Sequence, residues 1–118
     1  MPHEIILKVV NYYVDSRGRE PFRDWLETLK DVKAQARIEL RLDRLRTTGH
    51  FGDCKFVGEG VMELRIDCGP GYRIYYGVDQ KQVVILLCGG DKSSQEKDIQ
   101  RAKEYWRDYR RKNNADKT

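Results

Sequence analysis

The segment that decides the fold runs from Val61 to Lys92 and reads VMELRIDCGPGYRIYYGVDQKQVVILLCGGDK. Two segments of alternating apolar and polar residues flank the turn signal Gly69-Pro70-Gly71, and a wholly apolar segment follows them. Alternation with a period of two indicates a strand with one buried face, and a continuous apolar run indicates a central strand. We therefore predict three antiparallel strands over residues 61–66, 72–78 and 83–88, with a short basic site on their open face.

The charged residues of these strands fall on one side of the predicted sheet. Glu63 and Arg65 share one face of their strand, and Arg73 and Tyr75 share one face of theirs, because side chains alternate along a strand. The alternate positions are apolar and must face the core, where helices have apolar stripes to bury. The charged set is therefore expected to lie together on the open face.

The remaining elements support this sheet. A strand is predicted over Ile5 to Val14, followed by a short helix that begins at Pro21 and a second helix over Val32 to Arg46 that ends at Gly49. Residues 50–60 are irregular, with a possible short strand over 55–57, and Ser93-x-x-Glu96 is a capping box that starts a last helix. We predict one α+β domain over 1–118 in the order β-α-α-β-β-β-α, an antiparallel-rich sheet packed on a helical hairpin with a C-terminal helix, and a disordered tail over 113–118.

Composition narrows the classes of function. The chain has 118 residues, a net charge of +4 and a pI of about 9.0, which weakly favours a nucleic acid or an acidic protein as partner. Three cysteines without a CxxC spacing and two histidines make a zinc site or a disulfide framework a poor expectation. There is no apolar run of about 18 residues and no signal-peptide pattern, so we expect a cytoplasmic protein without a membrane segment or a cofactor.

Four basic residues are predicted near the open face: Lys55, Arg65, Arg73 and Lys92. Asp91, Glu63 and Tyr75 could join them, but no Ser-His-Asp or Cys-His set and no good carboxylate pair can be assembled. A cationic cluster suits a phosphodiester, because arginine binds phosphate oxygens with a bidentate fork and preorganised cations stabilise the charge of the transition state. RNA supplies its own nucleophile, the 2′-hydroxyl, and Tyr75 could stack on a base.

Each of these features also has an ordinary structural interpretation. Arginines on an open sheet face are commonly solvated charges, and Glu63 with Arg73 could form a simple cross-strand pair. Arg37, Arg41 and Arg44 form a stripe on the second helix that is either a solvated face or an RNA-binding surface. Residue chemistry alone thus predicts a small basic α+β domain with a possible role in RNA binding.

Three motifs resemble one family when they are taken together. They are Glu63-Leu64-Arg65, the run GYRIYY over residues 71–76, and the run LLCGGDKSSQ over residues 86–95. Their order and spacing resemble the RelE/ParE toxin superfamily, and in particular its HigB-like addiction module killer branch, which is related to phage Gp49-like proteins. The resemblance covers nearly the whole chain, from the first strand to the last helix.

This resemblance implies a toxin of a type II toxin–antitoxin system that is neutralised by a helix-turn-helix, HigA-like antitoxin protein. It implies a ribosome-dependent, metal-independent mRNA endoribonuclease (mRNA interferase), with mRNA and the ribosome as partners and inhibition of translation as the outcome. Carried over by position, Arg73 would stabilise the scissile phosphate, Lys92 would hold phosphate or assist the leaving oxygen, and Arg65 and Lys55 would bind RNA or transfer a proton. Glu63 would act as general base or would orient the arginines.

Two alternatives remain open at this point. One is a ParE-like toxin that inhibits DNA gyrase and cuts nothing, and the other is an inactive prophage relic that only binds its antitoxin. The sequence departs from RelE in having Val61 and Glu63 where RelE has lysines, and Asp98 and Ile99 near the position of a RelE tyrosine. The basic residues Arg65, Arg73 and Lys92 favour the nuclease.

Overall fold

The computed structural model describes residues 8–115, which form an α+β fold around a five-stranded mixed sheet. The strands are β1 (Val9–Tyr12), β2 (Cys54–Gly58), β3 (Val61–Ile66), β4 (Tyr72–Asp79) and β5 (Val83–Gly90). They lie in the order β1-β5-β4-β3-β2. The three strands predicted from the segment 61–92 are confirmed as neighbours in an antiparallel arrangement, whereas β1 runs parallel to β5 at the edge.

Three α-helices lie within residues 8–115: α1 (Pro21–Thr28), α2 (Val32–Thr48) and α3 (Gln95–Ala115). Pro21 occupies the first helical position of α1, and Gly49 ends α2 in the left-handed conformation (φ 73°) that a glycine adopts without strain. Gln35 of α2 donates hydrogen bonds to the carbonyl oxygens of Leu26 (3.1 Å) and Leu29 (2.7 Å), so it fastens the end of α1 to α2.

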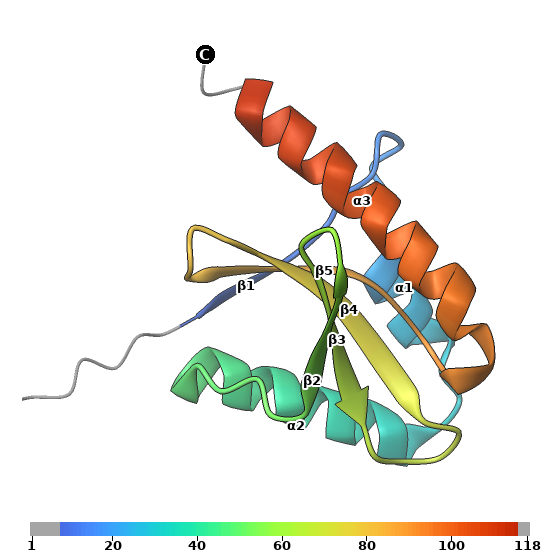
Figure 1. Cartoon of the computed structure of the whole chain (residues 1–118). Coiled ribbons are helices and arrows are strands. Elements are labelled where there is room, and N and C mark those ends of the chain that lie inside the picture. Colours follow the sequence, from blue (N-terminus) through green and yellow to red (C-terminus); the bar gives the residue numbers. More distant parts are fainter. Residues whose placement is uncertain (1–7, 116–118) are drawn as a thin grey trace, which may run out of the picture.

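Helices cover both faces of the sheet (Figure 1). On the α1/α2 face, Phe22 of α1 and the buried stripe of α2 pack against alternate sheet residues; the stripe consists of Ala34, Ile38, Leu42 and Leu45. On the α3 face, Ala102 and Trp106 of α3 pack against Val61, Tyr75 and Leu87. The prediction that this face of the sheet is open is therefore wrong for much of its area, because α3 covers it.

The predicted order leaves out one strand, which the segment 55–57 indicates only as a possibility. The predicted order had three strands after the helices, but β2 makes a fourth by pairing antiparallel with β3, with a bulge between Phe56 and Gly58. Three glycines, an exposed Phe56 and exposed charges hide the strand pattern in this segment. The possible strand at 55–57 was the correct interpretation.

Three predicted boundaries also change. The first strand is shorter than the predicted Ile5–Val14, and residues 5–7 lie outside the described range. The capping box is not used: Asp91 caps a 3₁₀ turn, η1 (Lys92–Ser94), by accepting a hydrogen bond from the Ser93 backbone N–H (2.8 Å), and α3 follows directly. The helix then continues through Ala115, and residues 116–118 of the predicted disordered tail lie outside the described range.

A bulge in β5 sets which glycines face which helix. Tyr75 pairs with Cys88 but the next residue, Tyr76, pairs with Leu86, so Leu87 is the extra residue and the alternation of β5 shifts there. As a result Gly89 faces α1 and Gly90 faces α3. A Cβ at Gly89 would collide with the Trp25 ring, and a Cβ at Gly90 would collide with the Asp98 carboxylate.

Candidate functional site

The sheet places two arginines directly opposite each other on its α3 face. Arg65 of β3 pairs in register with Arg73 of β4, and Arg73 pairs in turn with Gly90 of β5. Two residues along the strands and on the same face, Glu63 pairs with Tyr75, and Lys55 of β2 pairs with Glu63. Like charges directly opposite each other destabilise a sheet, so a nearby carboxylate has to compensate for the two arginines.

The Glu63 carboxylate supplies that compensation from a fully buried position. Its Oε1 lies 3.3 Å from Arg65 Nε and 3.6 Å from Arg73 Nε. Its Oε2 accepts hydrogen bonds from the Tyr75 hydroxyl (3.1 Å) and from Gln95 Nε2 (2.9 Å). The side chain has 0% of its surface exposed, against 40% for Arg65 and 13% for Arg73.

These contacts keep Glu63 ionised. Burial alone would raise the pKa of the Glu63 carboxyl, but hydrogen bonds from Gln95, Tyr75 and Arg65, together with the charge of Arg73, outweigh burial and hold the pKa below its usual range. The same arrangement raises the pKa of Tyr75, first by burial and then through the negative charge of Glu63. At neutral pH the cluster therefore contains one carboxylate, two guanidinium groups and a neutral phenol.

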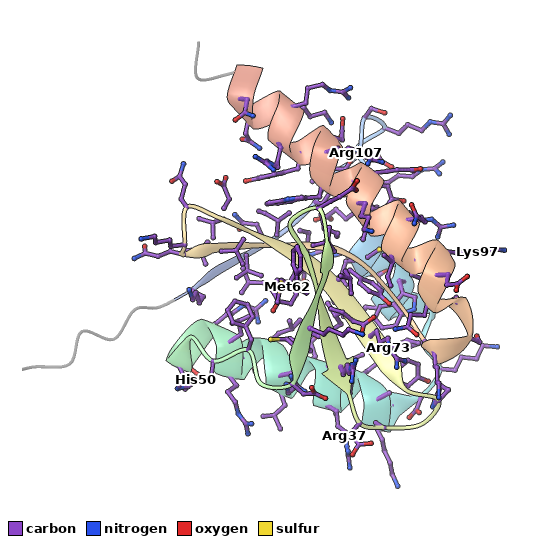
Figure 2. All side chains as sticks on the ribbon, in the orientation of Figure 1. Arg37, His50, Met62, Arg73, Lys97 and Arg107 are labelled. Carbon is purple, nitrogen blue, oxygen red and sulfur yellow. The ribbon has the colours of Figure 1, made fainter. Side chains whose placement is uncertain are left out.

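Arg73 is held at only part of its guanidinium group. Its Nη1 donates to the carbonyl oxygen of Gly71 (2.8 Å), while its buried Nε has no hydrogen-bond partner among the described residues. A buried donor without a partner is uncommon and often marks a functional position. Figure 2 shows Arg73 at the end of the sheet near the first turns of α3.

A cavity of about 240 Å³ opens beside the two arginines. Lys92 lies close by, because a Cβ at Gly71 would be 3.3 Å from Arg73 Nη1 and 3.7 Å from Lys92 Cβ. The cavity is lined by residues of β3, of β4 and of the turn between them, and by one residue before β2: Asp53, Arg65, Ile66, Asp67, Cys68, Gly69, Gly71, Tyr72 and Arg73.

The structure thus brings together Arg65, Arg73 and Glu63, with exposed Lys92 and Lys55 at the margin. The structure gives two neighbouring residues surroundings that were not expected. Tyr75 cannot stack on a base in this conformation, because it is completely buried under α3. Asp91 is occupied as a cap: the hydroxyl and the backbone N–H of Ser93 both donate to its carboxylate and lower its pKa.

One arginine of the α2 stripe differs from the expectation. Arg41 is half-buried and donates to the carbonyl oxygens of Arg65 (2.7 Å) and Phe51 (2.7 Å), so it fixes the loop before β2 rather than facing solvent. Arg37 is exposed and donates to the carbonyl oxygen of Asp67 (2.8 Å), and Arg44 is exposed. Figure 2 shows Arg37 beside α2, away from α3.

Sequence reasoning missed Gln95. This residue opens α3 and reaches Glu63 across 32 positions of sequence. A glutamine beside a capping box is an ordinary helix residue, and no local pattern marks it. Only the packing of α3 on the sheet brings it to the carboxylate.

Two further findings concern other classes of site. Within residues 8–115, no group of three or more His, Cys, Asp or Glu side chains could hold a metal ion. None of the helices in that range has the length and apolar character needed to cross a membrane.

Comparison with known proteins gives the family. Residues 24–107 match the family described as Phage derived protein Gp49-like (DUF891). The chain is also 54% identical over 82 residues to an uncharacterized protein of Haemophilus influenzae strain Rd, a match that covers 70% of this chain and 82% of the other. The chain belongs to the phage-derived Gp49-like family, which in general is a family of RelE/HigB-like toxins.

Proposed function

We propose that this protein is the toxin of a type II toxin–antitoxin pair and that it cleaves mRNA on the ribosome. The observation that carries the proposal is the pair of arginines facing each other beside a cavity, with one buried carboxylate between them. A protein that only binds a partner has no need of such a cluster. Membership of a family of RelE/HigB-like toxins supports the same conclusion.

The proposed reaction is transesterification within the RNA. The 2′-hydroxyl oxygen attacks the adjacent phosphorus, the bond from phosphorus to the 5′-oxygen breaks, and a 2′,3′-cyclic phosphate and a 5′-hydroxyl form. The proton of the 2′-hydroxyl is lost to solvent and the leaving oxygen gains one. Negative charge grows on the phosphoryl oxygens in the transition state, so fixed cations lower the barrier preferentially.

Each residue then has a distinct part in this reaction. Arg73 and Arg65 stabilise the charge on the phosphoryl oxygens, and Lys92 donates to a phosphate or to the leaving 5′-oxygen. Lys55, exposed in register with Glu63, binds the RNA backbone. Glu63 orients the arginines and is not the general base, because it is buried and both of its oxygens are in use.

The proposal includes the partners. The substrate is translated mRNA in the ribosome, and the inhibitor is a helix-turn-helix antitoxin of the HigA type. The protein would act in the cytoplasm, where all of these partners are found.

Primer extension on a defined mRNA in a reconstituted translation system, with and without ribosomes, tests the proposal. We expect cuts on translated message only, and we expect them to disappear with Arg73→Ala and to weaken with Lys92→Ala. Arg111→Ala is the matched control, because Arg111 is an exposed arginine at the far end of α3. Growth arrest without mRNA cleavage, accompanied by a DNA-damage response, would contradict the nuclease proposal and favour inhibition of DNA gyrase.

A further inference from the structure

The two oxygens of Glu63 contact different kinds of donor. Oε2 accepts from the neutral donors, the Tyr75 hydroxyl and Gln95 Nε2, whereas Oε1 faces the Nε atoms of both arginines. The neutral donors therefore fix the rotation of the carboxylate without competing for its second oxygen. That second oxygen is left for Arg65 and Arg73.

Gln95 has a fixed position because the first turn of α3 is fastened to the sheet. Asp98 is buried, accepts a hydrogen bond from the Ser94 hydroxyl (2.5 Å), and occupies the space where a side chain at Gly90 would lie. The Cys88 thiol donates to the carbonyl oxygen of Asp98 (3.6 Å). Gln95, three residues before Asp98, is thereby brought to Glu63 from a different layer of the fold.

From this geometry we infer that Gln95 and Tyr75 are positioning residues, which hold the Glu63 carboxylate so that its Oε1 fixes Arg73 and Arg65 for the phosphate. The inference rests on the proposed function and adds two residues to it. With their Nε atoms directed at Glu63, the arginines are oriented before the substrate arrives. The terminal nitrogens of the half-exposed Arg65 remain available for it.

The pH dependence of this arrangement involves the charged and titratable groups that neighbouring elements bring to Glu63. Arg65 on its own strand, Lys55 on β2, and Arg73 and Tyr75 on β4 face it directly. Cys88 on β5 and Asp98 on α3 lie beside Tyr75, and Lys92 on η1 lies beside Arg73. Burial raises the pKa of Glu63, and the Gln95 hydrogen bond lowers it. Without that hydrogen bond, the pKa of Glu63 therefore rises. Protonation of Glu63 then releases the arginines at a higher pH than in the wild type.

The test compares Gln95→Met, which keeps the length of the side chain but cannot donate, with Gln95→Glu, which adds a second carboxylate. We expect the acid side of the pH profile of mRNA cleavage to move to higher pH in Gln95→Met and further in Gln95→Glu. Cleavage by Gln95→Met should return toward the wild-type rate at high pH. Gln100→Met is the matched control, because Gln100 is an exposed glutamine on the same helix.

A carboxyl NMR titration of Glu63 in the same variants separates this inference from the proposed function. We expect the pKa of Glu63 to rise in parallel with the cleavage profile, and exchange of the Arg65 Nε proton, which is donated to Glu63 Oε1, to become faster. If cleavage falls equally at every pH while the pKa of Glu63 is unchanged, the role of Gln95 is only structural and the inference is overturned. If the wild type cleaves nothing, the proposed function falls, and Nε exchange alone decides whether Gln95 positions the arginines.

Tyr75→Phe provides a second variant that keeps the buried ring. It removes one donor from Glu63 Oε2 and should shift the Glu63 pKa in the same direction as Gln95→Met. The amide spectrum of the distant half of α3 shows whether each variant is folded. A folded Tyr75→Phe protein with a wild-type Glu63 pKa would remove Tyr75 from the proposal.

Discussion

Two regions of α3, its first turn and the part around Trp106, contact the same face of the sheet by opposite means. In its C-terminal half, Trp106 fills a space next to Gly60 and Gly77 and stacks on Tyr109, with ring centroids 5.2 Å apart. At its first turn, Gln95 and Asp98 make polar contacts with a buried carboxylate and with the end of β5. Trp106 and Asp98 are both buried, but the contacts around Trp106 are mainly apolar and those at the first turn are polar.

The difference separates stability from function along one helix. Burying an indole ring contributes several kcal/mol, about 3–5 by the usual cost of its removal. A buried ion pair recovers little beyond the cost of desolvating its charges, so the charged end gives a defined arrangement of groups rather than stability. Substitutions at the two ends should therefore have different consequences, and the predictions below run from the largest expected effect on stability to the smallest.

Trp106→Ala should have the largest effect. Loss of the buried ring is expected to lower the free energy of unfolding by about 3–5 kcal/mol, which urea denaturation measures directly. Arg107→Ala is the neighbouring control, because its pair with Glu59 is exposed and should contribute less than about 1 kcal/mol. A Trp106→Ala protein as stable as this control would show that the apolar end does not anchor α3.

Gly77→Ala tests the same contact between Trp106 and the sheet, with the change made on β4. A Cβ at Gly77 would lie 2.5 Å from the indole carbon Cε3 of Trp106, so the ring must move. We expect a loss of about 1–3 kcal/mol from overpacking. In a Trp106→Leu background the loss should nearly vanish, since the ring is gone, and a double-mutant cycle measures this coupling. Two additive effects would contradict the contact.

Tyr13→Phe removes one of the polar contacts that the C-terminal half of α3 makes. The Tyr13 hydroxyl donates to the Asp108 carboxylate (2.5 Å), and this bond is the main reason that the pKa of Asp108 is lowered. Stability from a lowered carboxyl pKa is present above the unfolded value, about 3.9 for Asp, and is lost as the pH falls through the folded value.

The free energy of unfolding of the wild type should therefore exceed that of Tyr13→Phe by about 1–2 kcal/mol at neutral pH. The difference should shrink in acid, where Asp108 is protonated. Urea denaturation of both proteins over a series of pH values measures it. Tyr12→Phe is the control, because Tyr12 lies on the adjacent position and opposite face of β1. A difference that stays constant with pH would assign the effect to packing.

Arg65→Ala should have the smallest effect on stability and a large one on activity. The side chain is 40% exposed and faces a second arginine, so relief of that repulsion offsets part of the cost of losing its hydrogen bond to the buried Glu63. The free energy of unfolding should fall by about 1 kcal/mol. Toxicity on induced expression should nevertheless be lost, and Arg65→Lys should restore little of it because lysine has no bidentate fork. A stable but fully toxic Arg65→Ala protein would remove Arg65 from the site.

Much of the fold could be predicted because its signals are local. Each of these signals depends on a few neighbouring residues: the alternation in 61–66 and 72–78, the apolar run before Gly89, and the helix boundaries at Pro21 and Gly49. The structure confirms the strands and helices that they indicate. The relation to Gp49-like proteins, read from three spaced motifs, is also confirmed by the family match. The alternation further predicted that Glu63, Arg65, Arg73 and Tyr75 share one face, and they do.

The environment of that face could not be predicted in the same way. Whether a polar face meets solvent or a helix depends on where α3 packs, and the amphipathic pattern of α3 does not say which side of the sheet it covers. The bulge at Leu87 could not be predicted either, because every residue around it is apolar and no alternation marks the shift. It directs Gly90 toward α3, where the absence of a side chain leaves space for Asp98. The parallel pairing of β1 with β5 likewise joins segments more than 70 positions apart.

The sequence by itself determined which residues could form the basic cluster, because side-chain chemistry and strand alternation are properties of neighbouring positions. Only the tertiary structure decided what these residues became. Glu63, which the sequence predicts to be exposed, is buried under α3 as an ionised carboxylate that contacts both arginines. Tyr75 is also buried and donates a hydrogen bond to Glu63 instead of stacking on a base. Gln95 becomes a second donor to Glu63 because α3 packs on the sheet. The physical reason is that desolvation and hydrogen bonding depend on what surrounds a group, and those surroundings come from distant parts of the chain.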